Sequence, residues 1–443
     1  MPEFDYDVVY IGSGHGTFDG AMPLAAKGKR VAVIEADKVG GTCPNWGCNA
    51  KILLDGPVAL QHTLRASDGI VSGDGKIDWA KNKAHKQAAI DVIPDALKGG
   101  MEASGIKMYF GHGTIIGEHT VAVDGEPITA ENIVIATGLR PHQLDVPGTE
   151  LGHDSKEFMA LDEMPKHMVI IGGGYIGVEF ATMANAAGSD VSLVLHDGEA
   201  LRGFHQPYVK EVLADLESRG VTIVRNQEVK SFEQQGHQVE VALSDETITT
   251  DWVLDATGRV ANVENLGLED LEIQHSPKGI VVNEYLQTTV PSIYVSGDVI
   301  DKEQPKLTPT AQFESQYLMH RFAGESDAAI DYPAIATNVF TTPRIAQAGV
   351  TVAEAQADPD KYIVQENDLS GDWYRAVDYE KNAKLTLIFN KDKQLVGATE
   401  ISERAEDSIN ALLPAIEFGY TPAQLERLVY IFPAIAFDSI SKL

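Results

Sequence analysis

The chain has 443 residues, of which 44% are hydrophobic and 23% charged, and its formal net charge is −30 at pH 7. This length predicts a globular protein of two to four domains. No apolar run reaches the roughly 20 residues that span a bilayer, and a strongly acidic chain repels a phosphate backbone, so we expect neither a membrane nor a nucleic-acid partner. The N-terminus enters a strand pattern without the basic and apolar regions of a signal peptide, which favours the cytoplasm.

A glycine-rich turn follows the first apolar run. The stretch "DVVYIGSGHGTFDGAMPLAAKGKRVAVIEAD", from Asp7, predicts a strand, a turn, a small-residue helix and a second strand that ends at Glu35. In a dinucleotide-binding βαβ unit, glycines let the backbone approach a pyrophosphate and the terminal acid holds ribose hydroxyls. Thr17 replaces the third glycine of the pattern. The turn residues expected beside the pyrophosphate are Gly12, Gly14, His15 and Gly16.

A second copy of this pattern begins at Met168. Its glycines are complete, at Gly172, Gly174 and Gly177. After its second strand, His196 occupies the position where an acid would favour NAD. Together with Arg202 it is suited to meet a 2′-phosphate, which favours NADPH, whereas NADH stays usable if His196 only ends the strand in solvent. Two nucleotide-binding folds predict two dinucleotides and electron transfer between them.

The two cysteines of the chain lie close together in "GGTCPNWGCNAK", at Cys43 and Cys48. Two thiols cannot form a disulfide scaffold for a chain of this length, and they supply only half of a four-thiolate metal site. We therefore interpret the pair as a redox centre and expect no bound metal.

Three further segments complete the predicted organisation. "ENIVIATGLRP" and "DWVLDATGRVAN" each predict a strand and turn that close one nucleotide domain. In "PSIYVSGDV", Asp298 follows a strand, where a carboxylate is suited to the polyol of a flavin. From about Tyr332 the pattern changes to predicted strands ("TNVFTT", "WYRAVDYE", "KLTLIFN") and a helix, "SERAEDSINALLPAIEFG", which is typical of an α+β domain.

Together these segments resemble the pyridine nucleotide-disulfide oxidoreductases, the flavoprotein family of glutathione reductase, dihydrolipoamide dehydrogenase and mercuric reductase. The resemblance rests on "IGSGHG", "GGTCPNWGCNAK", "ATGLRP", "IGGGYIGVEF", "ATGRVAN", "YVSGDV" and "KLTPTAQFE", in the family order. It implies an α/β homodimer with two Rossmann-like, three-layer ββα nucleotide-binding domains and a C-terminal α+β dimerisation domain. The implied boundaries are 1–148 and 266–331 for FAD, 149–265 for NAD(P)H and 332–443 for the interface.

The resemblance also implies roles at the redox centre. Hydride passes from NAD(P)H to FAD, which then reduces a Cys43–Cys48 disulfide, with Cys48 as the charge-transfer thiolate and Cys43 as the thiol that attacks substrate. Lys51 lies beside the flavin N5 and pairs with Glu179, and Tyr175 covers the flavin until nicotinamide displaces it. The other residues implied to contact FAD are Gly41, Thr42, Ala136, Thr137, Gly138, Leu307 and Thr308. Those implied at NAD(P)H, besides Tyr175 and Glu179, are Ile176 and Gly258.

The C-terminal segment "YIFPAIAFDSI" departs from the family. Where the disulfide reductases carry a histidine and a glutamate that reach across the dimer as the acid-base dyad, this chain has Phe432 and Phe437. Neither ring carries a proton, and a positioned acid-base group typically contributes about 10²- to 10⁴-fold to a rate. An apolar pair also raises the pKa of Cys43 by desolvation. Alternatively, the two rings pack the dimer interface while Tyr430 or solvent moves protons.

Several functions are compatible with this departure. The acceptor is either an atypical disulfide or a small molecule that needs no thiol protonation, such as a Cu or Hg ion or a quinone. A third alternative is the family branch of 2-ketopropyl coenzyme M oxidoreductase/carboxylase, which cleaves a thioether, although that branch carries histidine at the position of Phe437. The fourth is a flavin-binding sensor without turnover. The presence of Cys43, Cys48, Lys51 and Glu179 together argues against a sensor.

Overall fold

The computed structural model describes residues 4–67, 69–73 and 75–443 and divides into two compact units. Unit 1 consists of Met1–Leu53, Ala84–His142 and Arg259–Asp331, and unit 2 of Leu54–Lys83, Gln143–Gly258 and Tyr332–Leu443. This division places the segment predicted for NAD(P)H in the same unit as the predicted interface domain. The finer three-domain boundaries stay a prediction.

A parallel sheet forms the centre of unit 1, because its short apolar strands are buried on both faces. The strand order is β3-β2-β1-β6, with β18 parallel to β6 on its other side. Strand β6 is long enough that its first half also pairs with β5 in a second, antiparallel sheet, and β4 pairs with β5 in turn. The bounds are β1 (Tyr6–Ile11), β2 (Val31–Glu35), β3 (Lys107–Phe110), β4 (Gly113–Gly117), β5 (Thr120–Val123), β6 (Glu126–Ile135), β7 (Leu139–Pro141), β15 (Arg259–Ala261), β16 (His275–Ser276), β17 (Gly279–Ile280) and β18 (Ile293–Val295).

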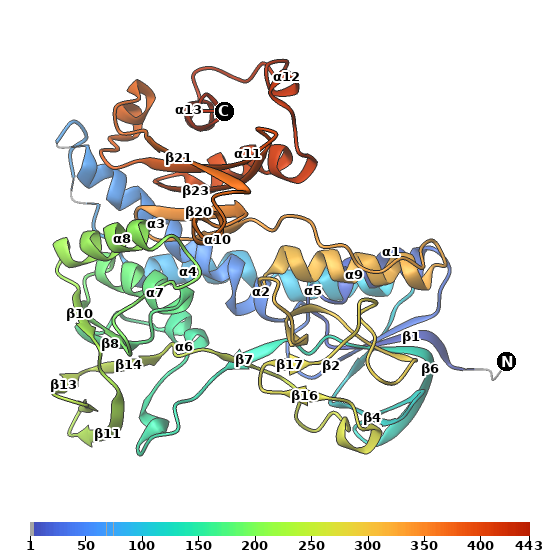
Figure 1. The fold of residues 1–443 in the computed structure, drawn as a ribbon. Helices are drawn as coiled ribbons and strands as arrows, with labels where there is room; N and C mark the ends of the chain where they lie inside the picture. Colours follow the sequence, from blue (N-terminus) through green and yellow to red (C-terminus); the bar gives the residue numbers. More distant parts are fainter. Residues whose placement is uncertain (1–3, 68, 74) are drawn as a thin grey trace. The chain divides into compact units, whose positions relative to one another are not determined.

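Two helices of unit 1, α1 (Phe18–Ala26) and α9 (Thr308–Phe322), lie side by side (Figure 1). Gly20 permits this contact, because a Cβ there would lie 2.1 Å from the carbonyl oxygen of Ser315. The Ser315 hydroxyl accepts a hydrogen bond from the Gly20 N–H at 2.9 Å and donates one to the Thr17 carbonyl at 3.0 Å. The remaining helices that lie wholly or partly in unit 1 are α2 (Thr42–Trp46), α3 (Cys48–Ala66), α4 (Trp79–Ile90), α5 (Ile93–Ala103) and the 3-10 turns η2 (Glu269–Leu271) and η3 (Gly297–Val299).

Unit 2 repeats this construction in the segment that carries the second glycine turn. A parallel sheet in the order β10-β9-β8-β14 accompanies an antiparallel sheet in the order β11-β12-β13. The bounds are β8 (His167–Ile171), β9 (Asp190–Leu195), β10 (Thr222–Arg225), β11 (Val229–Gln235), β12 (Gln238–Leu243), β13 (Thr247–Thr250), β14 (Trp252–Asp255), α6 (Ser155–Ala160), α7 (Tyr175–Ala186) and α8 (Gln206–Ser218). The predicted pair of Rossmann-like folds is confirmed.

The C-terminal part of unit 2 is an antiparallel sheet in the order β19-β20-β23-β22-β21, packed against helix α11. One predicted strand, at residues 373–380, is wrong: Trp373–Asp378 form the 3-10 helix η4, in which Arg375 turns inward to meet carboxylates. The other bounds are β19 (Thr337–Val339), β20 (Arg344–Gly349), β21 (Tyr362–Asp368), β22 (Lys384–Asn390), β23 (Leu395–Ser402), α10 (Val352–Ala357), α11 (Ala405–Phe418), α12 (Pro422–Leu425) and α13 (Ile435–Ile440).

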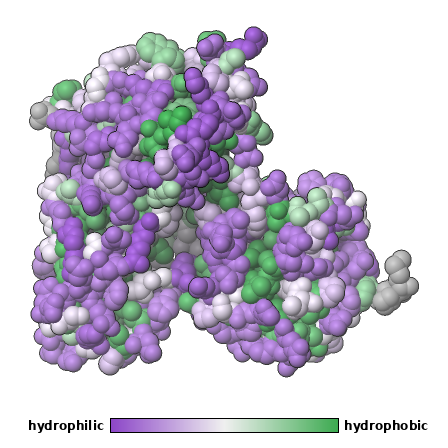
Figure 2. Space-filling model, viewed as in Figure 1, coloured by the Kyte–Doolittle hydropathy of each residue, from purple (hydrophilic) through white to green (hydrophobic). Residues whose placement is uncertain are grey.

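Hydrophilic residues cover most of the visible surface, and apolar residues gather there in separate patches (Figure 2). This surface accords with the net charge of −30. Within the described ranges, no helix has both the length and the apolar character needed to cross a bilayer.

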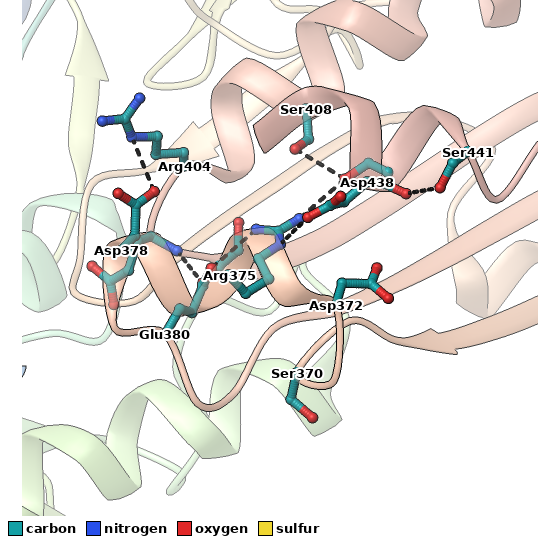
Figure 3. A network of polar contacts seen from close by, with 12 residues as sticks. Ser370, Asp372, Arg375, Asp378, Glu380, Arg404, Ser408, Asp438 and Ser441 are labelled. Carbon is teal, nitrogen blue, oxygen red and sulfur yellow. Dashed lines mark hydrogen bonds and ion pairs between the residues drawn. The ribbon is translucent and has the colours of Figure 1, made fainter. Parts of the chain in front are cut away.

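A buried ionic network joins η4, β23 and α13 (Figure 3). The fully buried Arg375 guanidinium lies 3.0 Å from Glu380 and 3.1 Å from Glu400, and Asp438 approaches its Nε at 3.8 Å. Ser439 donates a hydrogen bond to Glu400 at 2.7 Å, which anchors the segment that carries Phe437. Burial raises the pKa of Glu380 to about 7 and outweighs the opposite effect of Arg375, because several carboxylates share that one cation.

We expect this network to make stability depend on pH. The folded chain holds a proton on Glu380 up to about pH 7, whereas the unfolded chain releases it near the ordinary value of 4.5. The free energy of unfolding therefore falls as pH rises through this window, by up to about 3 kcal/mol. Glu380→Gln should flatten that dependence in urea titrations between about pH 5 and about pH 8. The exposed Glu233→Gln is the matched control, and an equally steep profile in Glu380→Gln would contradict the expectation.

Candidate functional site

The two cysteines lie on either side of a tight turn in unit 1. Cys43 belongs to the short helix α2, and Cys48 is the first residue of the 19-residue helix α3. Gly47 allows the turn, because a Cβ there would lie 2.8 Å from the Thr42 carbonyl oxygen and 3.1 Å from the Cys43 Cα. Both cysteines are free thiols, Cys43 half-buried and Cys48 exposed. The turn thus brings the sulfurs within hydrogen-bonding reach of each other.

The surroundings of the two sulfurs separate their acidities. A hydrogen bond from Cys43 lowers the pKa of Cys48 to about 6, with further help from Thr308 and the positive charge of Lys51, against the effect of desolvation. The same hydrogen bond and burial raise the pKa of Cys43. Its Sγ also lies 3.9 Å from the Asn49 side-chain oxygen. The pair therefore gives up its first proton more readily than a free cysteine does, and the start of α3 and the charge of Lys51 favour Cys48 as the sulfur that carries the negative charge.

The first glycine turn is built for close backbone approach. Gly12 has a φ of +104°, and a Cβ there would lie 2.3 Å from the Ala136 carbonyl oxygen. A Cβ at Gly16 would lie 3.0 Å from the Ser296 carbonyl oxygen. The turn therefore meets the ends of β6 and β18, which places Gly14, Thr137 and Gly138 in one region. A dinucleotide pyrophosphate fits such bare backbone at the start of α1.

Two carboxylates accompany this turn. Glu35, at the end of β2, accepts hydrogen bonds from the Ser13 N–H at 3.0 Å and the Asp37 N–H at 2.8 Å. Asp298 lies in η3, its Oδ1 is buried, and no described residue donates to that atom. Burial also raises the pKa of Asp298. An unsatisfied buried acceptor fits a ligand hydroxyl, such as one on a flavin polyol.

His15 lies in the turn before α1 and contacts both that helix and α9. Its Nδ1 lies 2.6 Å from the Asp19 carboxylate and 3.2 Å from the Gln312 side-chain nitrogen. Its ring also packs on Phe18, with centroids 4.5 Å apart. These contacts hold His15 at the start of α1, where the sequence places it.

The second glycine turn has the same geometry in unit 2. A Cβ at Gly172 would lie 2.4 Å from the Ala256 carbonyl oxygen, while Gly174 and Gly258 face open space. Tyr175 and Ile176 begin α7. The Tyr175 ring is 39% exposed, packs edge-on against Phe204 and has a pKa that desolvation raises to about 12.

Glu179 and Lys51 belong to different units, so their predicted ion pair stays a prediction. The Glu179 side chain is buried and accepts a hydrogen bond from the Phe340 N–H at 2.9 Å. Lys51 is half-buried in the first turn of α3, where its charge acts on Cys48.

The predicted nucleotide-selecting residues are exposed after β9. His196 directly follows the strand, and Arg202 forms an ion pair with Asp197. Glu228 lies close enough to His196 for the two charges to interact. Asp197 and Glu228 therefore offset part of the positive charge of Arg202 and His196, which the sequence predicts to bind a 2′-phosphate.

Phe432 and Phe437 contact each other at the C-terminal end. Their ring centroids are 5.2 Å apart in an edge-to-face arrangement, and Trp373 packs on Phe432 at 5.8 Å. Phe432 is 58% exposed. The pair is thus an apolar cluster in which neither ring carries a titratable proton.

Sequence reasoning missed the ion pair of Lys302 and Glu314, which holds the turn before Asp298. Glu314 accepts a hydrogen bond from the Gly297 N–H at 2.7 Å, and Lys302 donates to the Gly297 carbonyl at 3.3 Å. Both side chains are almost fully buried. The local signal for this pair was the spacing of Glu314 with Ala311 and Leu318, which places the carboxylate on the buried face of the helix. In the part of the chain that the structure describes, no cluster of three or more histidines, cysteines or carboxylates is suited to hold a metal ion.

Comparisons with known proteins agree with this geometry. Residues 6–315 match the family described as pyridine nucleotide-disulphide oxidoreductase, and residues 335–439 match its dimerisation domain. Glutathione reductase of Nostoc sp. is 30% identical over 99% of both chains. Dihydrolipoyl dehydrogenase of Bacillus subtilis is 30% identical over 97% of this chain and 94% of its own length. Mercuric reductase of Staphylococcus aureus is 32% identical over 94% of this chain and 78% of its own length. This chain therefore belongs to the pyridine nucleotide-disulfide oxidoreductase family of FAD- and NAD(P)H-dependent oxidoreductases.

Proposed function

We propose that this chain passes electrons from NAD(P)H, through FAD and the Cys43–Cys48 pair, to an atypical disulfide or another small acceptor. The observation that carries the proposal is the turn at Gly47, which brings the two sulfurs within hydrogen-bonding reach of each other and places Cys48 at the start of α3. This contact lowers the pKa of Cys48 to about 6 and raises the pKa of Cys43. Bound FAD supplies the two-electron exchange with NAD(P)H that reduces the disulfide. We assign FAD to the first glycine turn, with Glu35 at a ribose and Asp298 at the flavin polyol, and NAD(P)H to the second.

The sulfur chemistry follows from the two acidities. Cys43 attacks one sulfur of a substrate disulfide, which forms a mixed disulfide and releases one thiolate. The Cys48 thiolate then attacks the Sγ of Cys43, which releases the second thiolate and restores the Cys43–Cys48 disulfide. Cys43 must lose its proton before it attacks, and both leaving thiolates must gain one.

Phe432 and Phe437 decide which acceptors suit this centre. Because neither ring transfers a proton, we expect slow turnover of ordinary disulfides. Faster acceptors are disulfides with acidic leaving thiols, or soft metal ions and quinones that need no thiol protonation. A steady-state screen of both nicotinamides against disulfides, Cu(II), Hg(II), quinones and oxygen separates these classes. Failure of every acceptor would favour a sensor, and thioether cleavage with carboxylation would identify the remaining alternative.

We also propose a cytoplasmic homodimer. The dimerisation domain carries large apolar residues on its surface, with Val429 97% exposed and Ile431 81% exposed. A second copy of the chain would cover these residues together with Phe432. Reducing cytoplasm keeps the thiols of such a centre available.

The redox assignment can be tested with cysteine variants. On anaerobic addition of NADPH, the wild type should develop a long-wavelength thiolate–flavin absorbance band. Cys48→Ser should lack this band and still retain flavin, because a serine hydroxyl in place of the thiol supplies no thiolate. Cys43→Ser is the matched control and should keep the band. An undiminished band in Cys48→Ser would refute the role of Cys48.

The missing dyad can be restored. Phe432→His with Phe437→Glu should raise kcat/KM for glutathione disulfide by at least about 10-fold, because a positioned acid-base group typically contributes about 10²- to 10⁴-fold. Phe432→Asn with Phe437→Gln supplies polarity without acid-base function and should give no such gain. Equal rates in the two double variants would place the limiting step elsewhere.

Nucleotide choice can be tested at His196. We expect the wild type to prefer NADPH, and His196→Glu should move the ratio of kcat/KM for NADPH over NADH roughly 10-fold toward NADH, because an acid there binds ribose hydroxyls and repels a 2′-phosphate. His237→Glu makes the same charge change on an exposed turn and serves as control. A wild type that prefers NADH, or a ratio that His196→Glu leaves unchanged, would overturn this assignment.

A further inference from the structure

A second helix begins at the sulfur pair. Helix α9 has 15 residues and starts at Thr308, and no side chain caps its N-terminus. Cys48 starts α3 in the same unit. The N-terminus of a helix carries partial positive charge, so a negative charge is favoured where both helices begin. This arrangement prepares the site for a thiolate but does not by itself select one sulfur.

Thr308 contributes a specific contact to this arrangement. Its Oγ1 lies 3.4 Å from the Cys48 Sγ, although the two residues are 260 positions apart in the chain. A thiolate has no hydrogen to donate, so the hydroxyl is the donor whenever Cys48 is ionised. Hydrogen bonds to charged groups are stronger than those between neutral groups.

The position of Thr308 is fixed by the packing of its helix. Ser315 joins α9 to α1 through hydrogen bonds at 2.9 Å and 3.0 Å. Glu314, on the same helix, is fully buried in its ion pair with Lys302. Helix α9 therefore cannot move as a whole away from Cys48 without breaking a buried ion pair.

We propose that the Thr308 hydroxyl is a catalytic group that donates a hydrogen bond to the Cys48 thiolate and so sets the pH range in which the reduced centre is active. The proposal rests on the proposed function and adds to it, because the family resemblance implies for Thr308 only a contact with FAD. It gives the sulfur pair a neutral donor that neither Lys51 nor the missing dyad provides.

Other groups also face Cys48, and each can be distinguished from Thr308. Cys43 approaches from α2, and Lys51 acts from the first turn of α3. Both remain when only the Thr308 hydroxyl is removed. Valine has nearly the shape of threonine without the donor, whereas serine keeps the donor without the methyl group. The two substitutions therefore separate hydrogen bonding from packing.

The experiment compares Thr308→Val with Thr308→Ser in the reduced holoenzyme. One readout is the pH midpoint of the thiolate–flavin band, and the other is the pH dependence of Cys48 alkylation by iodoacetamide, followed by mass spectrometry. The wild-type midpoint is expected near pH 6. In Thr308→Val it should rise by about one pH unit, a roughly 10-fold loss of thiolate below the midpoint. Thr308→Ser should stay near the wild type.

Thr310→Val is the matched control, because it removes a buried hydroxyl from the same helix that bonds to no described residue. It should leave the midpoint unchanged. An unshifted midpoint in Thr308→Val, or an equal shift in Thr308→Ser, would overturn the proposal. If Thr308→Val fails to fold, Thr308→Ala replaces it with the same expectations. Alkylation tests Thr308 even if the wild type shows no thiolate–flavin band, an outcome that would overturn the proposed function alone.

Discussion

One proton shared between two sulfur atoms is the constraint on which the chemistry of this chain depends. The turn at Gly47 brings Cys43 and Cys48 within hydrogen-bonding reach, and the start of α3 favours the charge on Cys48. Each thiol shifts the pKa of the other, because a hydrogen bond that stabilises one thiolate also holds the proton on the neighbouring sulfur. The two sulfurs thus differ in acidity before any substrate arrives, as the roles that we propose for them require.

The two glycine turns share one backbone geometry, which suits the two nucleotides that we propose for them. Gly12 and Gly172 both have positive φ, and a Cβ at either would strike the carbonyl oxygen of the residue that follows the neighbouring parallel strand, at Ala136 after β6 and Ala256 after β14. What differs is the setting. The first turn is accompanied by the buried carboxylate of Asp298, and the second by the exposed ring of Tyr175. The two proposed cofactor sites thus differ in their side chains, although their backbone geometry is the same.

Local patterns predicted the parts of this protein that depend on neighbouring residues. Strands around Gly12 and Gly172 follow from apolar runs beside glycine turns, and the close approach of the Cys43 and Cys48 sulfurs follows from their spacing. Contacts between segments that are distant in the sequence could not be predicted from local sequence patterns. The Thr308–Cys48 contact and the Lys302–Glu314 pair depend on how α9 packs, and η4 was predicted as a strand because its alternating pattern concealed the inward turn of Arg375.

The discontinuity of unit 1 has a consequence for biosynthesis. Strand β18 and helix α9 follow the second glycine-turn segment in the sequence, yet both belong to unit 1. Strand β18 pairs with β6, and α9 packs on α1 at Gly20. While the ribosome is still making residues before 293, the nascent first sheet lacks its last parallel strand and exposes one side of β6. Unit 1 therefore reaches its final form only late in translation, and a message truncated before that point yields an open-edged fragment that invites aggregation.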